Sequence, residues 1–453
     1  MDELTPIYAT GALILGYFAV AVARRRFDPF DPVWLFLVGY TQLYVIQPIS
    51  YHDWAVGARG QELVWTANLR VPWALAWFFL VYHWGPGRAV ARVLPSPPAG
   101  WSRGLAAAIA PPLVLWGLVC AGLVLRAGED ETVSAEGTLF RAFPFVMLVA
   151  AILLLVTGRS STTKSLFLPA GLFTAAAYVF IWMFNGKRSH SLICVLATMC
   201  AWYASRGRRP SWPVLFGTGL AGVMVVGIAI GWRGDRDHER SVAGFLAFIG
   251  DFNFKHVVAS LNLAKDDDDG RPISYESEEY GGYLLMVDTV PAKSPYDGGA
   301  SYLRVFSTFI PRIIWPSKPL FGRAQWVSAW IAGSEFERDE TFAGPAIGLL
   351  GATQLNGGAF GTLIVLACMA TVFRAAFAYF QTYAHLAWTQ FWWSITYYNA
   401  WFTTTNDDPL VWFYYNWGFT VLPVVVLMWW GSKARSAPAA EAARSAHGAA
   451  LAP

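Results

Sequence analysis

Residues 213–231, PVLFGTGLAGVMVVGIAIG, form one apolar stretch without a charged residue. A helix of this length can cross the hydrocarbon core of a bilayer, which is about 30 Å thick. Comparable stretches of roughly 15 to 25 residues recur from end to end of the chain. They predict about eleven helical spans, at residues 7–23, 33–50, 71–87, 105–125, 142–158, 166–184, 190–204, 213–231, 358–373, 385–403 and 410–430.

The composition supports a chain that lives largely in lipid. Of its 453 residues, 55% are hydrophobic and 14% are charged, which lies outside the range of a soluble globular domain of this size. The expected fold class is therefore all-α, a polytopic transmembrane helical bundle with one large extracytoplasmic loop. The net charge of +3 gives no reason to expect a nucleic-acid partner.

The spans divide the chain into four parts. Residues 1–232 carry the first eight spans, residues 233–344 form the large loop, and residues 345–431 carry the last spans. The tail, residues 432–453, is rich in Ala and Ser and is expected to be disordered. Glycines crowd residues 344–361, which predicts a re-entrant or closely packed start of the ninth span.

The distribution of Lys and Arg between alternate connections predicts the orientation. Positive residues gather on the cytoplasmic side of membrane proteins. The N-terminus and the large loop are then outside and the C-terminus is cytoplasmic. The connections assigned to the cytoplasm hold Arg24, Arg25, Arg26, Arg88, Arg92, Arg103, Arg159, Lys164, Arg206, Arg208, Arg209, Arg374, Lys433, Arg435 and Arg444.

Other cations lie on the outer side, against this trend. One interpretation is an interfacial anchor whose charge reaches out of the lipid. The other is an anion site, because a guanidinium donates two parallel hydrogen bonds to a phosphate. Six of these residues are candidates to line one basic cavity that fits a pyrophosphate: Lys187, Arg188, Arg233, Arg304, Arg312 and Lys318.

The large loop carries two predicted amphipathic segments. Apolar residues in 245–252 are spaced as one face of an interfacial helix. In residues 301–319 the apolar and basic residues also separate onto two faces, and Pro311 and Pro316 are expected to kink or end the helix.

Several polar residues near these cations are potential general bases. A solvated or salt-bridged side chain is the alternative for each of them. The candidates are His190, Asp235, Asp237, His238 and Asp251. The acidic run 266–269 lacks the spacing of an EF-hand and is interpreted as a solvated turn.

Three segments resemble the Wzy-type O-antigen polymerases, which join oligosaccharide repeat units and are relatives of the O-antigen ligases. These segments are the turn Gly186-Lys-Arg188, the stretch IPRIIWPSKP at 310–319, and the glycine-rich stretch 344–361. Their order extends the resemblance over residues 160–430. It implies a glycosyltransferase of the bacterial inner membrane with a periplasmic loop and with neither a metal ion nor another cofactor.

The resemblance also implies a reaction and a set of roles. The enzyme would transfer a growing glycan from undecaprenyl pyrophosphate to a sugar hydroxyl of the next lipid-linked repeat unit. Arg188, Arg233 and Arg312 would hold the leaving pyrophosphate, and a base in the outer loop would activate the hydroxyl, with His238 favoured over Asp235. No loop histidine matches the base of a ligase, which leaves this role open. A flippase and a chain-length regulator are the implied pathway partners.

Three alternatives remain. A ligase would use the same chemistry with a lipid or protein acceptor. A glycosyltransferase that uses polyprenyl-phosphate sugars would need acids in its first outer loop, whereas the predicted orientation puts Asp28 and Asp31 in the cytoplasm. A transporter of lipid-linked oligosaccharides would carry internal repeats and charges deep inside spans, and the charges in this sequence cluster at the predicted span ends.

Overall fold

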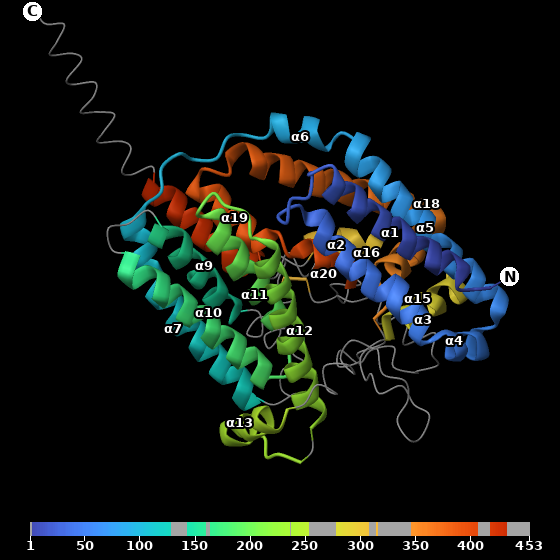
Figure 1. Ribbon diagram of the computed structural model, residues 1–453, viewed down its shortest axis with the longest axis horizontal. Helices are drawn as coiled ribbons and strands as arrows, with labels where there is room; N and C mark the ends of the chain where they lie inside the picture. Colours follow the sequence, from blue (N-terminus) through green and yellow to red (C-terminus); the bar gives the residue numbers. More distant parts are fainter. Residues whose placement is uncertain are drawn as a thin grey trace, which may run out of the picture. The chain divides into compact units, whose positions relative to one another are not determined.

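The computed structural model describes residues 2–127, 143–159, 164–235, 237–252, 278–307, 314–315, 346–405 and 417–432. Every regular element within these ranges is a helix (Figure 1), which confirms the all-α prediction. Seven helical segments within the described residues are long and apolar enough to cross a membrane. They are α1 (Thr5–Ala23), the segment Pro32–Ser50, α5 (Gln61–Trp84), α7 (Arg103–Ala127), α10 (Lys164–Phe184), α12 (Trp212–Gly234) and α18 (Gly348–Tyr383).

The other four predicted spans coincide with shorter helices. These are α9 (Phe145–Arg159), α11 (Arg188–Ala204), the pair α19 (Ala387–Thr396) and α20 (Asn399–Thr405), and the π-helix η3 (Trp417–Val421) with the apolar helix Leu422–Ser432. Residues 385–403, predicted as one span, are therefore two short helices. The predicted disordered tail lies outside the described residues from 433 onward.

The chain folds into two compact units. The first comprises Met1–Leu94, Leu215–Tyr379 and Tyr397–Phe413, and the second comprises Pro95–Val214, Phe380–Thr396 and Tyr414–Pro453. This division does not follow the four sequence segments, because the chain leaves the first unit after Leu94 and returns to it at Leu215.

Aromatic residues form the core of the first unit. The segment Pro32–Ser50 consists of α2 (Pro32–Thr41), the π-helix η1 (Gln42–Ile46) and α3 (Gln47–Ser50). Phe36 of α2 stacks on Phe78 of α5 with ring centroids 4.0 Å apart. On another side, α2 approaches α20 at Gly39, where a Cβ atom would overlap the hydroxyl of Thr404. Glycine is therefore required for this close packing.

Part of the large loop is embedded in the first unit. Among its described residues are the helices α13 (Val242–Asp251), α15 (Glu278–Thr289) and α16 (Ala300–Ser307). On α15, Tyr280 donates to Asn68 Oδ1 at 2.8 Å and Tyr283 donates to the Ala67 carbonyl at 2.9 Å, both on α5. The sequence patterns did not predict this buried helix, whose tyrosine hydroxyls find their partners only in the folded chain.

Helix α18 is broken near its start. Gly357 and Gly358 have non-helical backbone angles, so a short buried half-helix, residues 348–356, precedes the long apolar part. This agrees with the closely packed start predicted from the glycines in residues 344–361.

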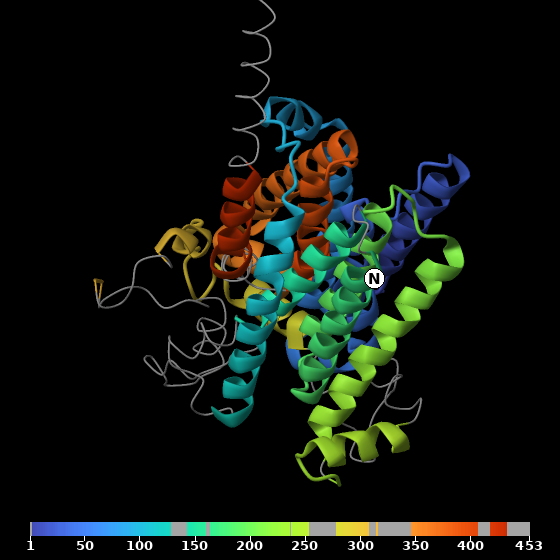
Figure 2. The same cartoon turned by 90° about the vertical axis from the view of Figure 1, so that its left-hand side faces the viewer.

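In the second unit α9 is the central helix. Most of its side chains are buried, and it packs between α7 and α10 (Figure 2). A helix that is apolar all round belongs in such a position. Gly171 of α10 lies against Leu155 and the Ala151 carbonyl of α9. Of the four cysteines, Cys120, Cys194 and Cys200 are buried, whereas Cys368 of α18 is exposed.

Candidate functional site at the end of helix α12

The last turn of α12 is anchored by α13. Trp232 is 1% exposed and packs on Phe245 and Phe248 with ring centroids 5.1 and 5.6 Å away. Ser241 begins α13 by accepting the Gly244 N–H at 3.1 Å, as an N-cap residue does. A helix does lie at the predicted position, with Phe245 and Phe248 buried, but Leu246, which the sequence pattern placed on the same apolar face, is exposed.

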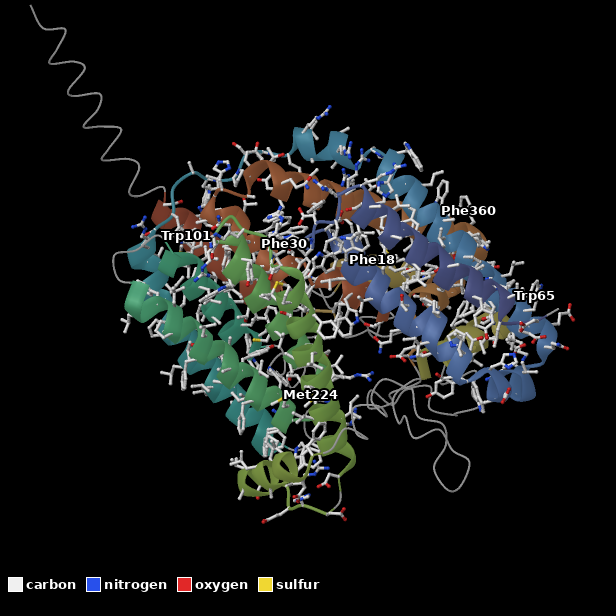
Figure 3. The ribbon with its side chains drawn as sticks, viewed as in Figure 1. Phe18, Phe30, Trp65, Trp101, Met224 and Phe360 are labelled. Carbon is white, nitrogen blue, oxygen red and sulfur yellow. The ribbon has the colours of Figure 1, made fainter. Side chains whose placement is uncertain are left out.

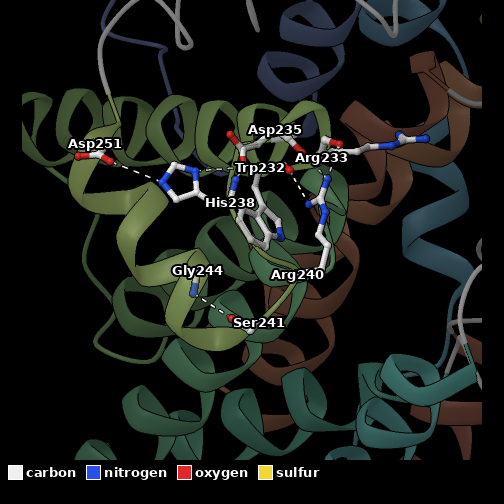
Figure 4. A network of polar contacts seen from close by, with 8 residues as sticks. All are labelled: Trp232, Arg233, Asp235, His238, Arg240, Ser241, Gly244 and Asp251. Carbon is white, nitrogen blue, oxygen red and sulfur yellow. Dashed lines mark hydrogen bonds and ion pairs between the residues drawn. The ribbon is translucent and has the colours of Figure 1, made fainter.

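Arg240 holds the chain between the two helices (Figure 4). Its Nη1 donates to the Trp232 carbonyl at 2.6 Å, and its Nη2 donates to the carbonyls of Arg233 and Asp235, each at 2.9 Å. The guanidinium also lies over the Trp232 ring, 4.6 Å from its centroid. Carbonyls at a helix C-terminus lack intrahelical partners, so Arg240 satisfies them and stabilises the turn.

Within this turn, His238 lies between two carboxylates (Figure 4). Asp235 Oδ2 accepts the backbone N–H of His238 at 3.0 Å and lies 3.2 Å from Nδ1 of its ring. The other ring nitrogen, Nε2, lies 3.5 Å from Oδ2 of Asp251, at the end of α13. The Asp235 side chain is 10% exposed and that of Asp251 is 79% exposed, so the imidazole is paired on one edge with a nearly buried carboxylate and on the other with an exposed one.

The charges around His238 shift its proton affinity. The hydrogen bond to Asp235 raises the pKa of His238, partial burial opposes this, and Asp251 adds to the increase. Burial alone would raise the pKa of Asp235, but the backbone N–H and ring of His238 bring it below its usual range. An imidazole that one carboxylate orients through Nδ1 can act as a general base or acid when a substrate displaces the exposed Asp251 from Nε2.

The arrangement is unsuited to a metal ion. Asp235 and Asp251 contact opposite nitrogens of one imidazole, so the three side chains do not converge on a point. Across the described residues, no group of three or more His, Cys, Asp and Glu side chains could hold a metal ion.

The structure brings together three of the five candidate bases, namely His238, Asp235 and Asp251. His190 is instead a packed side chain, stacked on Trp182 with centroids 4.3 Å apart. Asp237 is exposed in the turn that contains His238.

The predicted cations fall in several places. Lys187 is exposed and precedes α11, whose first residue is the half-buried Arg188; both belong to the second unit. Arg233, in the first unit, is exposed at the end of α12, and its side chain extends away from Asp251 (Figure 4). Arg304 lies in α16, where only its backbone is described, and Arg312 and Lys318 lie outside the described residues. The single basic cavity stays a prediction.

Sequence reasoning missed Arg240. Arg240 follows the apolar helix that ends at Gly234 and directly precedes the N-cap Ser241. This position was an available signal, because Arg is favoured near helix C-termini.

Comparison with protein families, with curated proteins and with solved structures finds no match to this chain. Its function is therefore argued from the residues of the site and from the apolar helices that carry them.

Proposed function

We propose that this protein is a membrane glycosyltransferase that joins lipid-linked oligosaccharide repeat units into a surface polysaccharide at the periplasmic face of the bacterial inner membrane, without a metal ion. The observation that carries the proposal is the His238 imidazole, which Asp235 orients at the end of an apolar helix while Nε2 pairs with Asp251, an exposed carboxylate that a substrate hydroxyl would displace. An enzyme that activates a sugar hydroxyl needs such a base.

The proposed topology has about eleven crossings, with the N-terminus outside and the C-terminus in the cytoplasm. Seven helical segments of spanning length among the described residues, together with the shorter helices at the other predicted positions, support it. In this topology the Gly234 end of α12 and the His238 site lie on the periplasmic side.

The proposed reaction uses His238 as its base. The acceptor hydroxyl loses its proton to Nε2 of His238 while its oxygen bonds to the anomeric carbon of the donor glycan. The bond from that carbon to the diphosphate breaks, and the electron pair leaves with the lipid diphosphate. Asp235 stabilises the imidazolium, and cations neutralise the leaving group, a role for which the sequence resemblance names Arg188, Arg233 and Arg312. The imidazolium then returns its proton to water.

A reconstituted assay tests the proposal. The purified chain in liposomes receives a lipid-linked repeat unit without nucleotide or metal, and products are resolved on a gel. The native chain should give a ladder of polymers, and Arg188→Ala, Arg312→Ala and His238→Gln should abolish it. Arg59→Ala is the matched control, because Arg59 pairs with Asp288 at 3.8 Å and has no role in the reaction.

Two outcomes would contradict the polymerase. Transfer of a single finished glycan to a lipid or protein acceptor would indicate a ligase. A folded protein that makes no ladder from any repeat unit would indicate another function.

A transporter of lipid-linked oligosaccharides is the second candidate. The observations that favour it are the break in α18 and the placement of Arg70 inside α5, since discontinuous helices and charges within spans mark transport sites. Cells that carry Arg188→Ala distinguish the two functions. Single repeat units at the outer face without polymer support the polymerase, and units trapped inside support the transporter.

A further inference from the structure

Arg70 lies within an apolar helix. The predicted span began at residue 71, which left Arg70 in a connection, but α5 runs without interruption from Gln61 to Trp84. Arg70 is therefore about 14 Å along the helix from its start. A charged side chain inside a span is costly, and when it persists it generally marks a binding or transport site.

One contact fixes this guanidinium. Nη1 of Arg70 donates to Oε1 of Gln354, and the amide nitrogen of Gln354 donates to the Val290 carbonyl. Gln354 is 2% exposed, and both its amide oxygen and its amide nitrogen are hydrogen-bonded. The buried amide therefore holds Arg70 in place.

Arg70 has no carboxylate partner in the part of the chain that the structure describes. By contrast, Arg59, on the neighbouring helix α4 (His52–Arg59), pairs with Asp288. A guanidinium has five N–H donors, and the Gln354 contact uses one. The donors of Arg70 that remain can bind an anion from outside the chain.

The residue that holds Arg70 belongs to the half-helix of α18. Three polar side chains of this half-helix, those of Thr353, Gln354 and Asn356, are buried. A turn of the large loop covers its end: the N–H of Asp297 donates to the Leu355 carbonyl at 2.8 Å, and the N–H of Gly299 donates to Asn356 Oδ1 at 3.1 Å. Within membranes, broken helices with buried polar groups are typical of substrate sites.

Apolar surface flanks the site. Helices α5 and α18 lie side by side, joined by the Arg70 contact and by a 2.8 Å bond from Trp77 Nε1 to the Leu363 carbonyl. Leu69, next to Arg70, is 49% exposed, and Phe360, just beyond the break, is 71% exposed. Figure 3 shows Phe360 on the outer flank of the first unit, on the side of α5. An anion that reaches Arg70 along this surface needs an apolar tail.

We propose that Arg70, positioned by Gln354 beside the break in α18, binds the diphosphate end of the polyprenyl lipid. The phosphate oxygens accept charge-assisted bonds from the guanidinium, and the tail lies over the apolar surface around Leu69 and Phe360. The identity of the lipid rests on the proposed function. The site itself is separate from the cations that the sequence singled out.

A binding measurement without turnover tests the site. The purified chain in nanodiscs of phosphatidylcholine is titrated with radiolabelled polyprenyl diphosphate. Arg70→Met should weaken binding roughly tenfold or more, and Arg70→Lys should weaken it less, because a charge is kept without the planar fork. Arg59→Met, which removes a paired cation, should stay within about twofold of the native chain.

Gln354→Met separates binding from a purely structural role. If Arg70 only held α18, Arg70→Met and Gln354→Met would weaken binding equally. If Arg70 binds the diphosphate, Arg70→Met should weaken binding more, at unchanged melting temperature. If Arg70→Met does not fold, the losses of affinity in Arg70→Lys and Gln354→Met are compared instead.

Three outcomes would overturn the site: native affinity in Arg70→Met, equal competition by phosphatidylglycerol, or equal competition by inorganic pyrophosphate. Failure of the site is distinguishable from failure of the proposed function. A chain that binds the lipid through Arg70 but makes no polymer keeps the site and loses the polymerase.

Discussion

Oδ2 of Asp235 accepts the backbone N–H of His238 at 3.0 Å and lies 3.2 Å from Nδ1 of the same residue. One carboxylate oxygen therefore fixes both the main chain and the ring of His238. Because Arg240 holds the carbonyl of Asp235, the pair is set by the fold of the α12 to α13 turn.

Asp235→Asn should lower the pKa of His238, because the hydrogen bond to Asp235 is the main cause of its increase. The acidic limb of the pH profile of kcat/KM should move to lower pH, while the maximal rate falls for lack of an oriented base. NMR titration of the imidazole protons measures the shift directly. Asp251→Asn, which removes the more distant and exposed carboxylate, should give a smaller change.

The same pair predicts a pH dependence of stability. The pKa of His238 is raised in the folded protein. Protonated His238 therefore stabilises the folded state fully below its unfolded pKa near 6.5, and this stabilisation is lost as pH rises through its folded pKa. The melting temperature of the native chain should exceed that of Asp235→Asn by more at pH 5.5 than at pH 8.5. A difference that grows with pH would contradict this interpretation.

Arg240→Ala should destabilise the turn by about 1 to 2 kcal/mol, a modest value because the side chain is exposed. The variant leaves the carbonyls of Trp232, Arg233 and Asp235 without their donor. Thermal inactivation in detergent measures the effect, with Glu239→Ala as the control from the same turn. Equal inactivation rates for the two variants would show that Arg240 does not stabilise this turn.

Gly358→Ala should destabilise the protein by about 1 to 3 kcal/mol. Gly358 has φ +60°, and a Cβ there would lie 2.7 Å from the Tyr296 hydroxyl oxygen. Gly357→Ala is the matched control, because nothing lies within 4 Å of its Cβ position. The difference between the melting temperatures of the two variants is the measurement. A lower melting temperature for Gly357→Ala than for Gly358→Ala would show that the backbone angle of Gly358 and its contact with Tyr296 do not determine the break in α18.

Asp31→Asn should flatten part of the pH dependence of stability. Asp31 caps α2 through the Val33 N–H at 3.0 Å and accepts the Tyr82 hydroxyl at 2.5 Å. Burial raises the pKa of Asp31 to about 6 in the folded protein. The protonated carboxyl therefore favours the folded state fully below the unfolded pKa near 3.9, and this contribution to the free energy of unfolding is lost as pH rises through about 6. Melting temperatures at pH 4.5 and 7.5 check this, and an unchanged difference between them in the variant would contradict it.

The sequence by itself determined the helical class and most helix positions. Apolar length and period are local properties, so residues 7–23, 166–184 and 213–231 correspond closely to α1, α10 and α12. Locality also explains why His238, Asp235 and Asp251 lie together, since Asp235 and His238 share one turn and α13 brings Asp251 back beside them.

Only the tertiary structure decided where polar residues enter the apolar helices. Arg70 and Gln354 are 284 positions apart, and neither their contact nor the burial of Tyr280 against Asn68 has a local signal. The polar side chains at the start of α5 led to the prediction of a connection before residue 71. The helix continues through them because distant partners satisfy their hydrogen bonds. Burial of a polar group is favourable only with such partners, and the fold supplies them.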